Sequence, residues 1–419
     1  MASSPNTTGS SVSDGFTGST TGDIAVYIAI AIAVAVAIIV ITVLMYKAQK
    51  FLLHRRMANI HSINDNITTT DDNSTLYVET SGIEMQTINR FIDDILKEKI
   101  IKFASQHLKD FTKNYTEKLG SGGFGTVYKG GFSNGVQVAV KVLHRTLDRS
   151  AEQQFMAEVG TIGRTFHFHL VRLYGFCFEA TLKALVYEYM ENGSLDRYLF
   201  NTGHHIEFET LHAIAVGTAK GIRYLHEECE HKIVHYDIKP GNILLTANLS
   251  PKVADFGLAK LCDRDRSHIT ITGARGTPGY AAPELWMPLP VTEKCDVYSF
   301  GMLLFEILGR RKNLELDKQI ESQEWYPRWV WQKFEQGQVE AILSQAGIED
   351  EDREKAERLC KIALWCVQYH AEGRPSMSSV VKMLEGEEAI VAPRNPFAHM
   401  ADYTAGSSML RDIEGDFSY

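Results

Sequence analysis

The stretch that decides the fold is His235-Tyr236-Asp237-Ile238-Lys239-Pro240-Gly241-Asn242, with Asp255-Phe256-Gly257 beginning eighteen residues after Asp237. It places an Asp, a Lys two residues later and an Asn five residues later, so a carboxylate, an ammonium and an amide lie close together along the chain. Carboxylate and amide oxygens are the hard ligands that Mg²⁺ requires. The first string by itself fits a surface turn as well as it fits a functional site. The second motif, at this spacing, favours the functional site.

Together the two motifs resemble the catalytic loop and the metal-binding turn of protein kinases. Phosphoryl transfer requires a protein to orient a hydroxyl, to hold Mg²⁺ against the phosphates of ATP and to stabilise developing charge. The resemblance implies that Asp237 accepts the proton of the substrate hydroxyl and that Lys239 lies near the transferred phosphoryl group. Asn242 and Asp255 are then the expected ligands of Mg²⁺.

A glycine-rich segment, Leu119–Val127, carries the pattern G-x-G-x-x-G upstream of these motifs. The pattern is weak evidence by itself, but Val127 and Tyr128 continue it as a strand, which rejects a dinucleotide-binding turn, where a helix would follow. Val138-Ala139-Val140-Lys141 then follows at the distance of the third kinase strand, so Lys141 is expected to contact the α- and β-phosphates. By resemblance, the ATP-binding residues are Leu119, Gly120, Ser121, Gly122, Gly123, Phe124, Gly125, Thr126, Val127, Ala139, Lys141, Glu188 and Met190.

The rest of the small lobe is expected as one helix and two strands. Residues 152–166 have helical spacing, and Glu158 on this helix is the candidate ion-pair partner that positions Lys141. Residues 170–175 and 184–190 are typical of strands. By resemblance, residues 188–190 form the hinge that binds adenine, and Tyr187 stands at the gatekeeper position.

The large lobe is expected to begin with residues 192–195 capping a helix, followed by a longer helix over about 210–227. The activation loop runs from Asp255 to Glu284. By resemblance, Asp296 holds the catalytic-loop backbone from a buried position and Arg374 pairs with Glu284. Candidate phosphorylation sites in the loop are Ser267, Thr270, Thr272 and Thr277, of which Thr277 is also expected to contact the catalytic loop.

The resemblance covers residues 113–388 and predicts an α+β, bilobal protein kinase fold preceded by a single transmembrane helix. The motifs are most similar to those of plant receptor-like serine/threonine kinases, in particular the leaf-rust-resistance and lectin-receptor branch. One position departs from the common kinase pattern. Tyr236 stands where many kinases have an Arg that pairs with a phosphorylated activation loop, and an uncharged Tyr cannot fill that role.

Composition limits the partners and the compartment. The chain has 419 residues, of which 44% are hydrophobic and 23% charged, typical of a globular protein. Its net charge of −9 argues against nucleic acid as the main partner. The six cysteines show neither tight pairing nor Cys-x-x-Cys spacing, which favours free thiols in a reducing compartment.

Residues 24–46 contain no charged residue, and as a helix they would measure about 34 Å, enough to cross a hydrocarbon core of about 30 Å. The alternatives, a buried core helix or a cleaved signal peptide, fit less well because the run has no polar face, begins late and follows no basic residue. Lys and Arg are absent before Lys47 and abundant after it, so the positive-inside rule places the N-terminus outside and the kinase motifs in the cytosol. We therefore predict a single pass in the plasma membrane.

The remaining segments are expected to lack a fold of their own. Residues 1–23 form a short polar extracellular segment, in which Asn6 lies in a glycosylation sequon. They are too few to form a ligand-binding domain, so a co-receptor would supply the missing ectodomain. Residues 47–112 are expected as a cytosolic juxtamembrane linker, in which 101–115 resembles a segment that packs on the small lobe. Residues 389–419 are expected as a disordered tail.

Two classes of function remain. The first is an enzyme that transfers the γ-phosphate of ATP to Ser or Thr of protein substrates. The second is a pseudokinase scaffold that signals by binding. The scaffold is disfavoured because no part of the phosphate machinery is visibly lost: Lys141, Glu158, Asp237, Lys239, Asn242, Asp255 and Gly257 are all present.

Overall fold

The computed structural model describes residues 100–123, 125–144, 149–201, 203, 206–262, 276–287, 289–314 and 325–400. Within these ranges no helix is both long and apolar enough to cross a bilayer. Several predictions fall outside them: the polar segment 1–23, the span 24–46, the linker up to residue 99, Phe124, the candidate phosphorylation sites Ser267, Thr270 and Thr272, and residues 401–419 of the tail.

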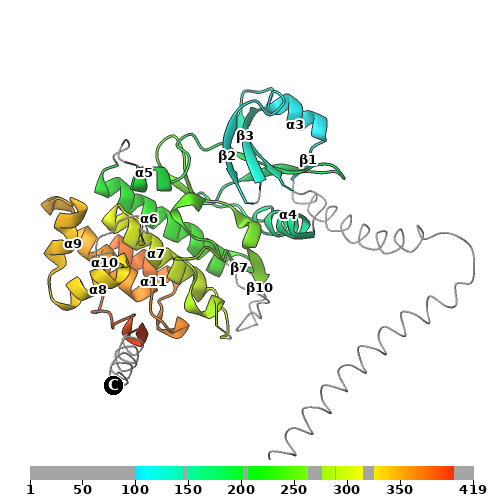
Figure 1. Cartoon of the computed structure of the whole chain (residues 1–419). Helices are drawn as coiled ribbons and strands as arrows, with labels where there is room; N and C mark the ends of the chain where they lie inside the picture. Colours follow the sequence, from blue (N-terminus) through cyan, green and yellow to red (C-terminus); the bar gives the residue numbers. More distant parts are fainter. Residues whose placement is uncertain are drawn as a thin grey trace, which may run out of the picture. The chain divides into compact units, whose positions relative to one another are not determined.

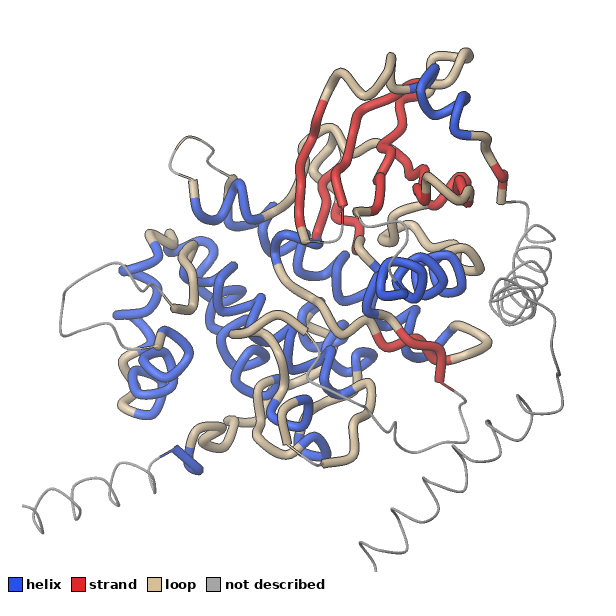
Figure 2. The backbone as a smooth tube through the Cα atoms, turned by 45° about the vertical axis from the view of Figure 1, so that its right-hand side comes forward, coloured by secondary structure: helices blue, strands red, loops and turns tan. Residues whose placement is uncertain are grey.

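The described part of the small lobe is built on a six-stranded sheet with the order β1-β5-β6-β4-β3-β2. All neighbouring strands pair antiparallel except β1, which runs parallel to β5. The six-stranded sheet lies in one lobe and most of the helices lie in the other (Figures 1 and 2). The strands of this sheet are β1 (Ile101–Lys102), β2 (Lys118–Gly122), β3 (Gly125–Gly131), β4 (Gln137–Leu143), β5 (Leu173–Phe178) and β6 (Lys183–Glu188).

Alternation along β4 assigns its side chains to the two faces of the sheet, because successive residues of a strand point to opposite sides. Val138 and Val140 are fully buried in a small core on one face. Ala139 and Lys141 lie on the other face and line the cleft between the lobes. The strand predicted at 138–141 is therefore confirmed, and it places Lys141 where the motif required it.

Helix α4 (Arg149–Ile162) covers the sheet face that carries Lys141. Phe155, Val159 and Ile162 are buried at helical spacing, and the Phe155 ring lies 5.6 Å from that of Phe176 on β5. The same helix therefore packs on the sheet and turns Glu158 toward Lys141, as the sequence predicted.

Residues 101–112 belong to the small lobe. Ile101 and Lys102 pair with Gly175 and Phe176 of β5, and α3 (Ser105–Phe111) buries Leu108 in the small core with Phe103. The prediction that residues 101–115 pack on the small lobe is confirmed. The prediction that the linker extends to residue 112 is wrong. The two strand residues are exposed and carry no alternating pattern, so periodicity did not reveal them.

Two local predictions near the hinge need correction. The strand expected at 170–175 begins only at Leu173, because the backbone of Val171 donates to Val253 of the large lobe instead (2.9 Å). The cap expected from residues 192–195 is also wrong. Helix α5 (Asp196–Phe200) has no side-chain cap, and the Asn192 amide donates to the carbonyls of Thr246 and Ala247.

The large lobe is helical around α7 (Lys294–Gly309), in which Cys295 through Leu308 are all buried. A helix that is buried on every side lies in the middle of a core. The helix expected at 210–227 is present as α6 (Phe208–Arg223), which continues into one π-helical turn, Tyr224–Glu228. The remaining elements are β7 (Lys232–Val234), β8 (Ile243–Leu245), β9 (Pro251–Val253), β10 (Lys260–Cys262), α8 (Tyr326–Glu335), α9 (Val339–Ala346), α10 (Arg353–Cys366) and α11 (Met377–Glu385).

Residues 389–400 pack on the large lobe, so the prediction of a disordered tail is wrong for this part. Phe397 is buried, and its ring meets the Trp325 ring edge-on at 4.9 Å. The Trp365 indole donates to the carbonyl of Val391 (2.9 Å), and the Gln368 amide donates to that of Arg394 (2.9 Å). Isolated apolar residues in a polar segment gave little sign of this anchoring.

Candidate active site

A cleft of about 550 Å³ separates the two lobes. It brings together the glycine-rich strands β2 and β3, Lys141 of β4, the hinge after β6, and Asn242 and Asp255 of the large lobe. Of the residues expected to bind ATP, those that line the cleft are Leu119, Gly120, Ser121, Gly122, Gly125, Val127, Ala139, Lys141, Glu188 and Met190.

Two expected ATP-binding residues in the described part do not line this cleft. Thr126 alternates with Val127 along β3, so its side chain lies on the other side of the strand, where its hydroxyl pairs with His144 Nε2 (2.9 Å). Gly123 lies at the tip of the glycine-rich turn and is likewise not among the lining residues. Phe124 is outside the described residues.

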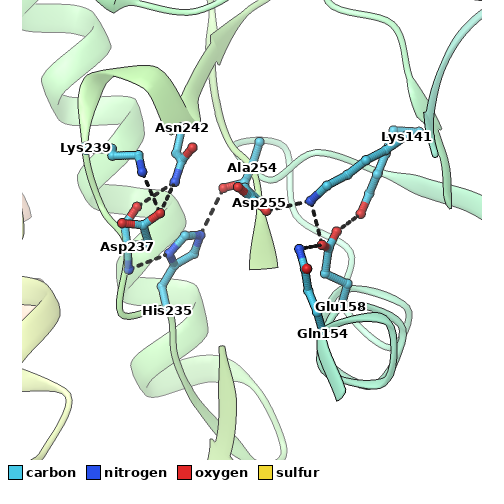
Figure 3. Close-up of polar contacts among 10 residues, drawn as sticks. Lys141, Gln154, Glu158, His235, Asp237, Lys239, Asn242, Ala254 and Asp255 are labelled. Atoms are coloured by element: carbon cyan, nitrogen blue, oxygen red, sulfur yellow. Dashed lines mark hydrogen bonds and ion pairs between the residues drawn. The ribbon is translucent and has the colours of Figure 1, made fainter. Parts of the chain in front are cut away.

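Lys141 lies between two carboxylates (Figure 3). Its Nζ is 2.6 Å from Glu158 Oε1 and 2.7 Å from Asp255 Oδ1. Burial alone would lower the pKa of Lys141, but the two carboxylates outweigh burial and raise this pKa above its ordinary value. Burial alone would raise the pKa of Asp255, and the Lys141 ammonium holds it below its usual range. Both shifts favour the charged forms of Lys141 and Asp255. The predicted Lys141–Glu158 ion pair is confirmed.

Two neighbours complete the surroundings of Glu158, which is fully buried. The Gln154 amide donates to Oε1 (3.1 Å) and the Tyr187 phenol donates to Oε2. Burial and the Glu158 carboxylate raise the pKa of Tyr187 well above its usual value, so the phenol keeps its proton. The residue at the gatekeeper position thus helps to fix the ion-pair partner of Lys141.

The catalytic-loop residues form a second cluster across the cleft (Figure 3). Lys239 Nζ donates to Asp237 Oδ2 (2.8 Å) and to the hydroxyl of Thr277 (2.8 Å), and that hydroxyl donates to Asp237 Oδ1. The Asn242 amide nitrogen donates to both the carbonyl and Oδ2 of Asp237. Thr277 is separated from Asp237 by forty positions, and its expected contact with the catalytic loop is confirmed.

Asp296 holds the backbone of this loop from within α7. Its carboxylate accepts from the backbone N–H groups of His235 and Tyr236, both at 2.8 Å, and from His226 Nε2 at 2.9 Å. Tyr236 has a left-handed backbone (φ 67°) and is buried. A non-glycine residue adopts this conformation only where its surroundings enforce it. The predicted role of Asp296 is confirmed.

His235 links the catalytic loop to the metal-binding turn. The backbone N–H of Asp237 donates to Nδ1 (3.2 Å), which leaves the proton on Nε2 to donate to the carbonyl of Ala254 (3.0 Å). Asp255 follows with a left-handed backbone (φ 64°), and its carboxylate turns into the cleft. The catalytic loop and the metal-binding turn are therefore joined through the imidazole of His235.

The donor set fits Mg²⁺ and the phosphates of ATP. Among the described residues no cluster of three His, Cys, Asp or Glu side chains could hold a metal alone. Mg²⁺ takes one or two protein oxygens, phosphate oxygens and waters, so few protein ligands are needed. Asn242 turns its amide nitrogen to Asp237, which leaves its oxygen for a metal, and Asp255 offers a carboxylate. At Gly120 and Gly122 a Cβ would meet open space, which leaves room for phosphates.

The predicted pair in the large lobe is also present. Arg374 NH1 and NH2 lie 2.5 and 2.9 Å from the two oxygens of Glu284, and both residues are buried. A bidentate pair fixes the end of the activation segment against the α10–α11 region. This pair supports the architecture and takes no part in the chemistry.

Several residues that line the cleft were not predicted from the sequence. Val171 and Leu244 supply apolar surface, and Arg197 also lines the cleft. Leu244 follows Asn242 by two positions on β8, so its spacing from the catalytic loop was an available signal. Arg197 follows a loop in which the backbone of Gly193 is left-handed (φ 65°), and no local pattern indicated that it faces the cleft.

Residues 114–384 match the family described as protein tyrosine and serine/threonine kinase. The match covers more than half of the chain and includes every residue of the two clusters above. This chain belongs to the protein kinase family. Within this kinase family, its sequence is similar to plant receptor-like members.

Three relatives illustrate that similarity. A G-type lectin S-receptor-like serine/threonine-protein kinase of Arabidopsis thaliana is 46% identical over 297 residues, which cover 70% of this chain and 34% of the relative. Rust resistance kinase Lr10 of Triticum aestivum is 43% identical over 74% of this chain and 49% of its own length. A leaf rust 10 disease-resistance locus receptor-like protein kinase-like protein of Arabidopsis thaliana is 42% identical over 76% and 50%. The matched region thus spans between a third and a half of these relatives.

Proposed function

We propose that this protein is a membrane-anchored receptor-like kinase that transfers the γ-phosphate of ATP to Ser or Thr of protein substrates, with Mg²⁺ as the metal. The observation that carries the proposal is a pair of complete clusters: Lys141 with Glu158 and Asp255, and Asp237 with Lys239 and Asn242. Lys141, Glu158, Asn242 and Asp255 line the same cleft.

Each residue has a separate task in this mechanism. Lys141, held by Glu158, contacts the α- and β-phosphates, and the hinge backbone at residues 188–190 binds adenine. Asp255 and the Asn242 oxygen hold Mg²⁺, which when bound neutralises charge on the phosphates. Asp237 accepts the proton of the substrate hydroxyl, and Lys239 stabilises the transferred phosphoryl group.

The choice of Ser or Thr as acceptor rests on Lys239 and Thr277. Lys239 lies two residues after Asp237 and contacts the Thr277 hydroxyl, so the ammonium is fixed beside the catalytic carboxylate. By resemblance, this arrangement is typical of serine/threonine kinases. The name of one relative includes the words serine/threonine-protein kinase, and the name of another includes the words resistance kinase.

The decisive experiment is an autophosphorylation assay of the purified full chain in detergent with Mg²⁺ and ATP. Wild type is expected to incorporate phosphate on Ser or Thr, and Asp237→Asn is expected to abolish incorporation while still binding nucleotide. Lys355→Gln is the matched control, because it alters an exposed ion pair remote from the cleft. A wild-type chain that binds nucleotide but phosphorylates neither itself nor a generic substrate would favour the scaffold.

Membrane anchoring is proposed from the sequence of residues 24–46, with Met1 outside and the kinase domain in the cytosol at the plasma membrane. Protease added to intact cells should remove an N-terminal epitope tag and spare a C-terminal one. The opposite pattern would overturn this topology.

A co-receptor is proposed as a partner of this chain. The names of the relatives include receptor-like and disease-resistance kinases. We therefore place the chain in cell-surface signalling, with defence as the process that those names favour. Crosslinking at the surface of cells that express the tagged chain tests for such a co-receptor.

A further inference from the structure

A second cavity lies in the large lobe, remote in sequence from the ATP cleft, with which it shares no lining residue. It has a volume of about 410 Å³. Arg311 lines it just after α7, Tyr326, Trp329 and Lys333 line it from α8, and Gln345 lines it from α9. Helices α8 and α9 lie on the left-hand side of the large lobe in Figure 1, away from the small lobe.

Two buried polar atoms of its lining residues have no hydrogen-bond partner within the described part of the chain: Arg311 Nε and the hydroxyl of Tyr326. The Tyr326 side chain is buried, and its hydroxyl end lies against Gly309, where a Cβ would come within 2.7 Å of that oxygen. Buried donors without acceptors are costly and rare. A ligand that brings acceptor oxygens into the cavity would remove this cost.

Charge points to the same kind of ligand. The cavity is lined by two cations, Arg311 and Lys333, and by no Asp or Glu among the described residues. None of the ion pairs between described residues includes Arg311; its guanidinium instead lies 5.2 Å from the centre of the Tyr326 ring. Lys333 donates to the Gln338 side chain (2.9 Å) at the rim. A guanidinium is suited to bind phosphate oxygens through two donors at once.

We propose that this cavity binds a phosphate monoester, with the phosphate at Arg311 and Tyr326 and its polar carrier between Lys333 and Gln345. The cavity exceeds the volume of a bare phosphate, so it has room for a small carrier. Glutamine side chains offer donors and acceptors to hydroxyl or amide groups of that carrier. The stacked rings of Tyr326 and Trp329, whose centres are 5.7 Å apart, form a rigid wall.

The carrier has two possible chemical sources, a sugar or a phosphorylated side chain, and calorimetry distinguishes them. The full chain in detergent is saturated with Mg²⁺ and a non-hydrolysable ATP analogue, so that the nucleotide cleft is filled. Glucose 6-phosphate, O-phosphoserine and inorganic phosphate are then titrated, with glucose and serine as neutral counterparts. We expect at least one phosphate monoester to bind and neither neutral counterpart to do so.

Variants locate the site. Arg311→Gln should weaken binding by about tenfold or more, because a charge-assisted contact is lost. Tyr326→Phe keeps the ring and removes only the hydroxyl, so it should weaken binding by a smaller factor and serves if Arg311→Gln fails to fold. Lys355→Gln removes a charge elsewhere and should leave binding unchanged.

Three results would overturn the proposal. The first is that wild type shows no heat of binding with any phosphate probe. The others are that Arg311→Gln binds as tightly as wild type, or that Lys355→Gln loses as much affinity as Arg311→Gln. Inorganic phosphate that binds as tightly as both monoesters would overturn the assignment of an organic carrier.

Discussion

The phenol of Tyr187 donates a hydrogen bond to Oε2 of Glu158, while the other oxygen of that carboxylate pairs with Lys141. The contact joins the end of β6, next to the hinge, to the middle of α4. Because Glu158 is fully buried, each hydrogen bond to it replaces solvation that the carboxylate has lost. The position of α4 and the state of the hinge are therefore connected through one side chain.

Replacing Tyr187 with Phe should lower the free energy of unfolding by about 1–3 kcal/mol, because one hydrogen bond to a buried charge is lost without a change in ring packing. Urea unfolding of the two proteins measures this difference. In a double-mutant cycle, Glu158→Gln should remove most of it. An unchanged urea midpoint for Tyr187→Phe would show that the contact contributes no stability.

Thr277 should be required for turnover through its hydroxyl. Thr277→Ala removes the contacts with both Asp237 and Lys239, and should lower kcat about 10- to 100-fold with little change in the KM for ATP. Thr277→Ser keeps the hydroxyl and should retain most of the activity. Steady-state kinetics on a peptide substrate compare the three proteins. A serine variant as inactive as the alanine variant would show that the methyl group matters instead.

Glu306 should make the stability of the large lobe depend on pH. Burial raises its pKa to about 7, although the Tyr280 phenol (2.7 Å) and the backbone N–H of Asn313 donate to the carboxylate. The folded state therefore holds this proton more tightly than the unfolded chain, whose Glu pKa is about 4.3. The resulting stability is fully present below about pH 4 and is lost as pH rises through about 7, by at most roughly 4 kcal/mol.

Urea unfolding of wild type and Glu306→Gln between pH 5 and pH 8 tests this sign. The amide cannot ionise, so the difference in unfolding free energy between wild type and variant should change in favour of the variant as pH rises. A difference that stays constant over this range would mean that Glu306 does not titrate there.

Phosphorylation of the activation loop should change activity only modestly. Tyr236 is uncharged and buried where many kinases carry the arginine that binds a loop phosphate. We expect the triple variant Ser267→Ala, Thr270→Ala, Thr272→Ala to keep kcat/KM within about tenfold of wild type, since the charge-assisted contact worth about 1.5–3 kcal/mol is missing. A loss of a hundredfold or more would show that another basic group binds the phosphate.

Much of the site was predictable because its residues stand at the separations along the chain that are typical of kinase motifs. The separation of Lys141 from Glu158 and that of Asp237 from Asn242 match the kinase pattern, and the residues were assigned by that resemblance. These separations hold regardless of how the lobes pack, so one sequence sufficed to identify the residues.

Features that depend on tertiary packing were harder to predict. Val171 looked like part of a strand until its backbone paired with Val253 in the other lobe. Phe397 looked like a lone apolar residue in a tail, although it is buried beside Trp325. Neither partner lies within ten residues, so no local period could have revealed the contact.

The parallel pairing of β1 with β5 also protects the small lobe from association with other chains. An uncovered outer strand offers unpaired backbone groups to any extended peptide. Ile101 and Lys102 pair with those backbone groups on β5. The backbone oxygen of Ile101 lies so close to Gly175 that only glycine fits there, because a Cβ at position 175 would be 2.1 Å from that oxygen. A fragment that begins at residue 114, where the family match starts, would leave this edge bare and prone to aggregate.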